Sequence, residues 1–516
     1  MNTPIRSFVV VGGGTAGWMA ACYLNRVFAD SGRNDITVTL VESADIGIIG
    51  VGEATLPTLR QTMNTLGIPE WKLVADTDAT LKHGIKFANW SYNPAKAPDD
   101  FYYHTFETPV VANGYNMMTH WQAMRETGAT QCKFHDLAGV QGALCDANLS
   151  PKMYNSPPYD APLPYGYHLD AVKLGHMLRD ISVLRSVRHV VDTITKVDVT
   201  QDGTITGVVT EKNGTIEGDF FIDCSGFVAL LIEKALHEPF IDMSDTLLCD
   251  RAVAIQVPHA PGSTTVRPYT TSTAKSAGWT WDIDLYTRRG TGYVYSSKFI
   301  GDDEAEAELR VHLGPVASQA QARRLRMRVG HRRRPWVGNC LAIGLASSFI
   351  EPLESTGIYL VEMALTMFLD YMDGNRGIAA LRDKYNSVMN NLFTDLSDFI
   401  VLHYVTTLRD DTPFWRAYKN DVKPSTALAE KLELWQHKVP GTSDLSERVT
   451  VFGPANYFYI MAGMRNLPHR GIAIRPYISR DMSQEAAASI QHMRAGAIKA
   501  APNHYEFIKK LRSTAL

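Results

Sequence analysis

The pattern of hydrophobic and polar positions is most regular at the start of the chain. Residues 8–11, Phe-Val-Val-Val, form a continuous apolar run, which is typical of a strand buried on both faces. A helical segment is predicted over residues 18–26, and a second apolar strand over residues 36–41. The order of strand, helix and strand indicates an α/β fold with a parallel sheet.

The glycine-rich turn between the first strand and the helix indicates a dinucleotide site. Gly12 permits the tight turn, Gly14 lets a pyrophosphate approach the backbone at the helix start, and Gly17 lets the helix pack closely on the strand. Glu42, which ends the second strand, suits an acid that binds a ribose diol. Glycines in a turn often mark only a turn, but here all the elements occur in order. The predicted cofactor-binding residues of this segment are Gly12, Gly14, Thr15, Ala16, Gly17 and Glu42.

Composition and charge restrict the class of protein. The 516 residues include 51 Lys+Arg and 54 Asp+Glu, and 45% are hydrophobic, as in soluble globular proteins. A formal net charge of −3 gives no electrostatic case for nucleic acid or an anionic membrane as partner. The six cysteines show no zinc-type or C-x-x-C spacing, and no apolar run approaches the ~20 residues of a membrane span. We therefore expect a cytoplasmic protein with reduced cysteines and no bound metal.

Later segments suggest that the nucleotide-binding domain is interrupted and then resumed. A β-rich stretch over residues 188–200 precedes a polar turn and a strand that ends in Asp-Cys-Ser-Gly at residues 223–226. This arrangement resembles the glutathione-reductase-like FAD-binding fold. The resemblance implies that Val191 packs on the adenine end of the cofactor and that residues 339–345 lead to a helix start near the flavin.

Three further motifs make the resemblance more specific. They are Gly-Val-Gly-Glu-Ala-Thr-Leu-Pro at residues 50–57 with a Lys-containing segment at 81–90, Gly-Trp-Thr-Trp-Asp-Ile-Asp at 278–284, and Phe-Ile-Glu-Pro-Leu-Glu-Ser-Thr-Gly-Ile at 349–358. With the glycine turn, they resemble the flavin-dependent halogenases of the tryptophan-halogenase family. The fold expected from this resemblance is an α/β, glutathione-reductase-like FAD-binding fold with an interleaved, mostly helical substrate module.

The resemblance also implies a reaction and its partners. FADH2 from a separate NADH-dependent flavin reductase would react with O2 and with chloride or bromide. Hypohalous acid made at the flavin would pass through an internal tunnel to a small electron-rich aromatic substrate. Only one complete glycine fingerprint is present in the sequence, which fits an enzyme that does not bind NADH itself. A homodimer is an expectation from the family alone.

Lys82 and Glu354 are the catalytic residues that the resemblance implies. An ammonium can donate to hypohalous acid and a neutral amine can be N-halogenated, while a carboxylate can stabilise or deprotonate the cationic ring intermediate. From the residues alone, Lys82 would extend to solvent and Glu354 would be an acid at a helix start. Lys86 is the nearest alternative to Lys82 and is interpreted as a surface residue.

The residues after Glu354 suggest an anion site. Ser355, Thr356 and Gly357 would present consecutive N–H groups at a helix start. By the resemblance, Thr356 and Gly357 bind the halide. Leu345 and Ile358 would contact the cofactor. An ordinary N-cap followed by a permissive glycine is the alternative, and both interpretations can hold together.

Two aromatic motifs concern the substrate. Trp279 and Trp281 alternate, so both should face one side of a strand. In the family, a W-x-W-x-I-P element is thought to keep the substrate away from the flavin, and here Asp284 takes the place of its proline. His104 and Phe106 match a His-x-Phe element that lines the family's substrate cavity, with threonine where the family usually has proline. Core packing is the alternative for the tryptophans and for His104.

The motifs divide the chain into four segments. We expect residues 1–90 to be the first FAD-binding segment and 91–164 to line the substrate cavity. Residues 165–375 would resume the FAD-binding part with an inserted β-sheet, and 376–516 would form the helical substrate module. Helical spacing over residues 428–435 and 484–498 supports the last assignment.

The sequence leaves more than one candidate for the substrate and for the reaction class. The amino-acid-binding residues of tryptophan-specific members cannot be matched one by one to residues 450–463, so indole, tryptophan and phenols are all candidates. A flavin monooxygenase that hydroxylates an aromatic substrate is the alternative enzyme. An FAD-binding protein with a decayed site is the alternative without activity, and the presence of Lys82, Glu354 and both tryptophans argues against it.

Overall fold

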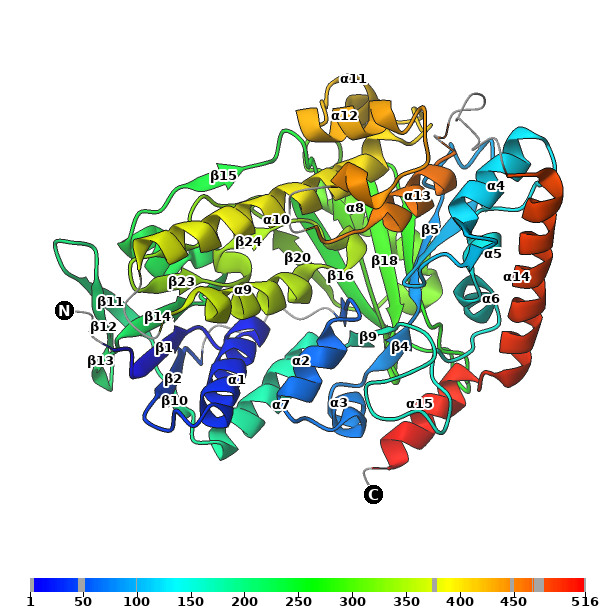
Figure 1. The fold of residues 1–516 in the computed structure, drawn as a ribbon. Helices are drawn as coiled ribbons and strands as arrows, with labels where there is room; N and C mark the ends of the chain where they lie inside the picture. The colour runs from blue at the N-terminus through cyan, green and yellow to red at the C-terminus, as the bar shows by residue number, and fades with distance from the viewer. Residues whose placement is uncertain are drawn as a thin grey trace. The chain divides into compact units, whose positions relative to one another are not determined.

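The computed structural model describes residues 4–44, 52–98, 100–373, 378–445, 450–465, 467 and 478–514 (Figure 1). These residues form two compact units, each assembled from three stretches of chain. The first unit comprises Met1–Asp78, Leu169–Met243 and Met327–Phe393, and the second Ala79–His168, Ser244–Arg326 and Thr394–Leu516. Gly50 and Val51 of the motif at residues 50–57 lie outside the described residues.

The first unit is built on a six-stranded, mostly parallel sheet. Its order is β10 (Arg188–Val191), β2 (Thr37–Glu42), β1 (Ser7–Val11), β14 (Phe220–Asp223), β23 (Cys340–Ala342) and β22 (Trp336–Val337). Only the pair of β22 and β23 is antiparallel. The strands predicted at residues 8–11 and 36–41 are confirmed as β1 and β2, and with them the α/β class. Because parallel strands end at one edge, the residues that follow β1, β2, β10 and β23 gather there.

Helices flank this sheet. Helix α1 (Thr15–Asp30) follows β1 directly and lies beside α7 (Ala171–Leu184), as Figure 1 shows. Trp18, Leu24 and Phe28 of α1 are buried, so one face of the helix packs inside the unit. Helix α9 (Gly357–Tyr371) contacts α1 and α2 (Leu59–Thr65), and α3 (Glu70–Asp76) contacts α7.

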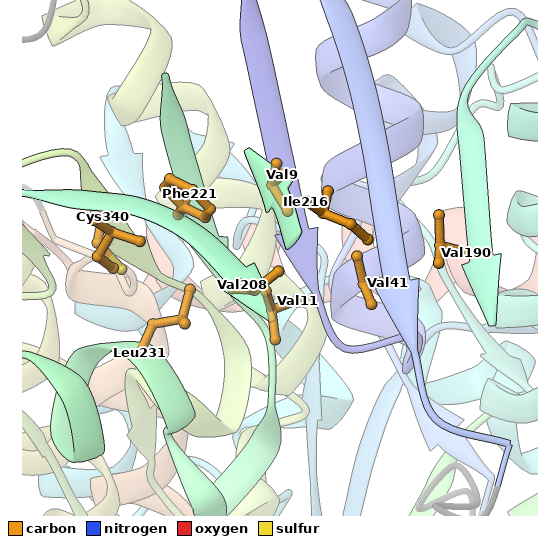
Figure 2. Packing of buried hydrophobic residues seen from close by; sticks show 10 residues of the cluster. Val9, Val11, Val41, Val190, Val208, Ile216, Phe221, Leu231 and Cys340 are labelled. Atoms are coloured by element: carbon orange, nitrogen blue, oxygen red, sulfur yellow. The ribbon is translucent and has the colours of Figure 1, made fainter. Parts of the chain in front are cut away.

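A separate meander packs on the same sheet through an apolar cluster. It consists of β11 (Ile194–Val199), β12 (Ile205–Thr210) and β13 (Gly214–Glu217), all antiparallel. Figure 2 shows Val208 and Ile216 of the meander among Val9, Val11 and Val41 of the parallel strands. Each such side chain contributes about 1.5–3 kcal/mol when fully buried. The cluster therefore fixes the strands whose ends form the predicted nucleotide site.

The second unit is built on a seven-stranded sheet. Its order is β20 (Ala322–Arg326), β16 (Arg251–Pro258), β19 (Arg288–Tyr295), β18 (Gly278–Asp284), β17 (Thr270–Ala274), β5 (Gly84–Ala88) and β6 (Phe101–Thr105). Only β17 and β5 pair in parallel. The short strand β4 (Thr80–Lys82) precedes β5 and pairs antiparallel with β9 (Gly166–Leu169).

Most helices of the structure contribute to the second unit. They are α4 (Met117–Glu126), α5 (His135–Ala138), α6 (Gln141–Asp146), α8 (Asp302–Leu313), α10 (Ala379–Val405, from Thr394 onward), α11 (Pro413–Asn420), α12 (Thr426–Leu434), α13 (Pro454–Gly463), α14 (Arg480–Ala500) and α15 (His504–Ser513). The helices predicted near residues 428–435 and 484–498 are confirmed as α12 and α14. Helix α14 runs along α4 (Figure 1). Among the helices that the structure describes, none is both long and apolar enough to cross a membrane.

The packing units and the predicted functional segments are different divisions of the chain. By packing, the β-sheet segment Ser244–Arg326 belongs with the second unit. The sequence division treats it as an insertion within the FAD-binding part. The assignment of each segment to cofactor or substrate remains a prediction, because it concerns function rather than packing.

We expect Gly12→Ala to destabilise the first unit. The φ of Gly12 is +109°, and a Cβ there would lie 2.3 Å from the carbonyl oxygen of Cys224. Strain of a left-handed backbone alone costs about 1–2 kcal/mol, so the free energy of unfolding should fall by about 2 kcal/mol or more. Urea denaturation measures this loss. Gly14→Ala is the matched control, because no atom lies within 4 Å of that Cβ position; equal losses in both variants would contradict the prediction.

Candidate active site

The turn between β1 and α1 has the geometry of a phosphate site. A Cβ at Gly17 would lie 1.8 Å from the carbonyl oxygen of Gly12, so only glycine permits this close approach. Gly14 instead faces open space and precedes α1 with no side-chain cap. The first N–H groups of a helix lack partners within the helix and favour an anion. The open space at Gly14 beside the helix start therefore suits an anion such as a pyrophosphate.

Glu42 lies against this turn. Its Oε1 is 2.7 Å from His189 Nε2, and a Cβ at Gly13 would lie 1.6 Å from its Oε2. Gly13 must therefore be glycine for the carboxylate to lie here, a requirement that the sequence analysis missed although the run of three glycines signals it. A carboxylate has about four acceptor positions, so one bond from His189 leaves capacity for ribose hydroxyls.

Other predicted cofactor residues also lie at this edge of the first unit. Val191 ends β10 in register with Glu42, and 52% of its side chain is exposed, so an apolar surface is accessible beside the carboxylate. Leu345 follows β23, and a Cβ at the neighbouring Gly344 would lie 2.9 Å from the Cβ of Ala16. The loop that carries Leu345 therefore lies against the start of α1.

The hydroxyl of Thr15 has a structural partner. Thr15 Oγ1 donates to the carbonyl oxygen of Ala171 at 2.9 Å and so joins the start of α1 to the start of α7. A phosphate contact from Thr15 would therefore come from its backbone N–H.

Glu354 precedes a second helix start in the first unit. It is buried, ends the short 3₁₀ turn Pro352–Glu354, and is followed by Ser355 in a left-handed conformation with φ of +63°. Helix α9 then begins at Gly357, and Thr356 provides no side-chain cap. Among the described residues, the buried Thr356 Oγ1 has no hydrogen-bond partner. A hydroxyl and helix N–H groups that lack protein partners suit a small anion.

Lys82 lies in the second unit and is fully buried. It ends β4, opposite Gly166 of β9. Its Nζ lies 5.1 Å from the ring centroid of Phe106, within the range of a cation–π interaction. The backbone N–H of Phe106 donates to the carbonyl oxygen of His83 at 2.8 Å. The structure thus brings together Lys82 and Phe106, two residues that the family resemblance selects separately.

Histidines that the sequence analysis did not select surround β4. Burial lowers the pKa of His83 to about 3 and that of His504 to about 4. Burial, followed by the charge of Lys82, also holds the pKa of His168 below its usual range. All three rings are therefore neutral near pH 7 and act through hydrogen bonds. His83 falls within the motif at residues 81–90 but was not selected there, and His168 and His504 lie far from it in sequence and belong to no motif.

His104 lies in an aromatic surrounding built from the C-terminal part of the chain. Its Nε2 is 3.0 Å from Asn456 Oδ1, and its ring centroid lies 5.6 Å from that of Tyr459. Phe399 and Phe452 lie slightly farther away, at 6.0 and 6.2 Å. Residues 450–463, which could not be matched to an amino-acid-binding site by sequence, thus supply much of the environment of His104.

The two tryptophans of β18 lie on one side of the strand as predicted, with ring centroids 6.5 Å apart. Asp284, which replaces the expected proline, is buried and pairs with Arg267, whose Nη2 lies 2.5 Å from Asp284 Oδ1. The backbone carbonyl of Asp284 also accepts a hydrogen bond from Thr80 Oγ1 at 2.6 Å. The unexpected aspartate is therefore part of an ion pair and contacts the strand of Lys82.

The interpretation of Lys86 as a surface residue is wrong. Its Nζ lies 3.9 Å from the ring centroid of Phe101 and 5.8 Å from that of Tyr103, and the side chain is half-buried. Burial lowers the pKa of Lys86. Its position on the next strand makes Lys86 a useful control for Lys82.

A family model for tryptophan halogenases matches residues 7–475. The chain belongs to the tryptophan halogenase family. It is 36% identical to the tryptophan 6-halogenase SttH of Streptomyces toxytricini, over 97% of both chains. It is 35% identical to the tryptophan 7-halogenase RebH of Lentzea aerocolonigenes, over 99% of both chains.

Solved structures of tryptophan halogenases agree with this assignment. The crystal structure of SttH superimposes with a TM-score of 0.91, covering 98% of this chain and 99% of that chain at 36% identity. BrvH of Brevundimonas sp. BAL3, a flavin-dependent halogenase, superimposes with a TM-score of 0.87, covering 98% and 99% at 31% identity. The protein is therefore a flavin-dependent halogenase, and the predicted FAD-binding fold with an interleaved helical module is confirmed.

We expect His504 to make the halogenase less stable in acid. The ring is neutral in the folded protein, whose His504 pKa is about 4, and titrates near 6.5 when unfolded. Between these values the unfolded chain binds a proton that the folded chain does not, so stability falls as pH decreases. From pH 7 to pH 5 this group should remove about 2 kcal/mol.

Urea unfolding at both pH values tests this prediction. His504→Gln cannot titrate, so the variant should lose about 2 kcal/mol less than the wild type between pH 7 and pH 5. The same pH dependence in both proteins would show that His504 does not carry the effect.

Proposed function

We propose that this halogenase uses FADH2, O2 and chloride or bromide to make hypohalous acid, which Lys82 and Glu354 direct onto an electron-rich aromatic substrate. The observation that carries the proposal is the complete burial of Lys82 next to the ring of Phe106. Fully buried lysines are rare, because transfer of an ammonium from water is costly. A buried amine beside an aromatic face suits the reaction of this family.

The first unit has the residues to hold FAD. Its pyrophosphate fits the open space at Gly14, its ribose the carboxylate of Glu42, and its adenine the exposed side chain of Val191. Leu345 and Ile358 would contact the flavin ring. When bound in reduced form, FAD supplies the electrons with which O2 oxidises a halide to hypohalous acid.

Thr356 and Gly357 would hold the halide. The buried hydroxyl of Thr356 and the first N–H groups of α9 are donors, and the positive end of the helix dipole favours an anion. Gly357 leaves open space, because no atom lies within 4 Å of its Cβ position.

Lys82 and Glu354 would divide the chemistry of aromatic substitution. The ammonium of Lys82 donates a hydrogen bond to the oxygen of hypohalous acid, which makes the halogen more electrophilic. The ring attacks the halogen, the oxygen–halogen bond breaks, and the oxygen leaves as water after it takes a proton from Lys82. The ring becomes a cation whose charge is spread over its other carbons, while the halogenated carbon is tetrahedral. The carboxylate of Glu354 stabilises this cation and takes the proton of that carbon, which restores the aromatic ring.

An indole is the substrate class that we favour. SttH and RebH, which cover nearly all of the chain, are named for halogenation of tryptophan. The aromatic surrounding of His104 offers stacking surfaces for a bicyclic ring. We also propose that a separate NADH-dependent flavin reductase supplies FADH2, since the sequence has one complete nucleotide fingerprint.

We expect Lys82→Met to abolish halogenation while the protein still consumes FADH2 and O2. Loss of the amine removes a group that contributes about 100-fold or more to the rate. The assay contains flavin reductase, NADH, bromide and tryptophan or indole, with product measured by mass spectrometry. Lys86→Met removes a half-buried lysine from the next strand and should retain product. A hydroxylated product from Lys82→Met would favour the monooxygenase alternative.

Glu354→Gln should lower product formation by about 10- to 1000-fold. If Lys82 and Glu354 act on the same substrate, the double variant should lose little more than the worse single variant. Multiplicative losses would instead indicate that the two residues act independently.

We expect His104→Ala to raise the KM for the aromatic substrate by about tenfold, which corresponds to about 1.4 kcal/mol of stacking. His135→Ala is a matched control, because His135 is a similarly buried histidine among aromatic rings, near Phe101 and Tyr103. Steady-state kinetics at varied concentrations of indole or tryptophan measure the KM of each variant. An equal KM in both variants would remove His104 from the substrate site.

A further inference from the structure

The strand that carries Lys82 has a buried edge. In its sheet β4 is an outer strand, and β9 is its neighbour among the described strands. Alternate residues of an antiparallel strand turn their N–H groups to opposite sides, so Leu81, which lies opposite Tyr167 of β9, can turn its N–H away from that strand. Leu81 is fully buried, so water cannot bond this group. A buried donor without an acceptor is unfavourable, so this N–H needs an acceptor from elsewhere in the chain.

His504 supplies the acceptor. The N–H of Leu81 donates to His504 Nε2 at 3.1 Å, a contact between residues 423 positions apart. Because Nε2 accepts, the proton of the neutral ring lies on Nδ1, which donates to the carbonyl oxygen of Val266 at 2.9 Å. Both ring nitrogens are therefore used, and the two bonds fix the tautomer and the orientation of the imidazole.

The residue on the other side of Lys82 is held by the same part of the chain. His83 Nε2 lies 3.0 Å from the carbonyl oxygen of Leu149, and Leu149 forms a β-bridge with Asn503. The N–H of His504 in turn donates to the carbonyl oxygen of Asn148 at 3.0 Å. Both neighbours of Lys82 thus depend on the segment that begins the C-terminal helix.

Helix α15 is fixed firmly enough to carry this role. Asn503 caps it by accepting a hydrogen bond from the N–H of Glu506 at 3.1 Å. Tyr505 stacks on Tyr286 with ring centroids 5.6 Å apart, and Phe507 is buried. Several contacts that do not involve β4 therefore hold the start of α15, while the two hydrogen bonds of His504 orient its ring.

We propose that His504 is a positioning residue for Lys82, so that the C-terminal helix contributes to halogenation through the backbone of β4. The inference rests on the proposed role of Lys82. A hydrogen bond to the residue before Lys82 fixes the peptide plane on which the lysine side chain stands. Misplacement of a reacting group by about 1 Å can lower a rate by about 100-fold, so a modest shift of this strand is enough.

Two substitutions test the two hydrogen bonds of the His504 ring one at a time. His504→Gln keeps an acceptor near the position of Nε2, whereas His504→Asn keeps a donor near Nδ1 and loses the acceptor for Leu81. Two quantities are measured: the ratio of halogenated product to NADH consumed, and the hydrogen–deuterium exchange of a peptide that contains Leu81. Tyr505→Ala, which weakens the packing of the same helix without touching β4, is the control for stability.

We expect His504→Asn to lower the ratio of product to NADH by about 10- to 100-fold and to accelerate exchange at Leu81. His504→Gln should restore both to within a few-fold of the wild type, and Tyr505→Ala should lower the melting temperature without a comparable loss of product. If His504→Asn does not fold, His504→Met, which fills a similar volume without a nitrogen acceptor, replaces it.

Unchanged product yield in His504→Asn or His504→Met would overturn the inference, as would equal losses in the Gln and Asn variants. Lys82→Met is assayed in parallel. If Lys82→Met still halogenates, the proposed function fails, and the role of His504 fails with it. If Lys82→Met is inactive while the His504 variants are fully active, only the positioning role is wrong.

Discussion

The burial of Lys82 is the constraint on which the candidate site of the second unit depends. Burial makes a charged amine costly, and further positive charge nearby would raise that cost. The nearby histidines His83, His168 and His504 are neutral because burial lowers the pKa of each. His504 bonds the backbone of β4 and His168 the hydroxyl of Thr80, while His83 bonds the carbonyl of Leu149, and none of the three adds positive charge. Neutral rings that both donate and accept are well suited to this task, because a protonated ring could not accept from Leu81.

The first unit would recognise a large anionic cofactor, in the proposed function, mainly with backbone groups. The backbone of Gly12 lies directly against Gly17, which closes the turn, and Gly14 leaves room for a ligand beside the N–H groups of α1. The carboxylate of Glu42 is already oriented by His189. Because these groups are fixed by the parallel strands and by the apolar cluster around Val9, little conformational entropy needs to be lost when the cofactor binds.

The sequence predicted those parts of the fold and site whose signals are local. The β1 strand, the glycine turn, α1 and Glu42 follow one another within a short stretch, and the alternation of Trp279 and Trp281 placed both rings on one side of β18. The contacts of His504 with Leu81, and of His104 with Asn456, join residues 423 and 352 positions apart. The His-x-Phe element marked His104 but not its partner, and His504 belongs to no motif, so nothing in the sequence distinguishes His504 from an ordinary core histidine. The run of three glycines marks position 13 in the sequence, but the reason for glycine there, the carboxylate of Glu42, is seen only in the structure.

Asp284 shows how a departure from a family motif can be compensated by its surroundings. A proline at this position would restrict the backbone. Arg267 would then keep Asp282 as a carboxylate partner but would lose Asp284. The carboxylate of the aspartate instead pairs with the guanidinium of Arg267. It also accepts a hydrogen bond from the backbone N–H of Arg267 at 2.8 Å. Its own carbonyl accepts from Thr80, two residues before Lys82, a bond that needs no particular side chain at position 284. The ion pair with Arg267 thus restrains the backbone at position 284, as a proline would. The hydrogen bond from Thr80 of β4 to the carbonyl of residue 284 is kept. Since Arg267 follows Val266, whose carbonyl accepts from His504, the loop that receives Asp284 also orients the imidazole that bonds Leu81.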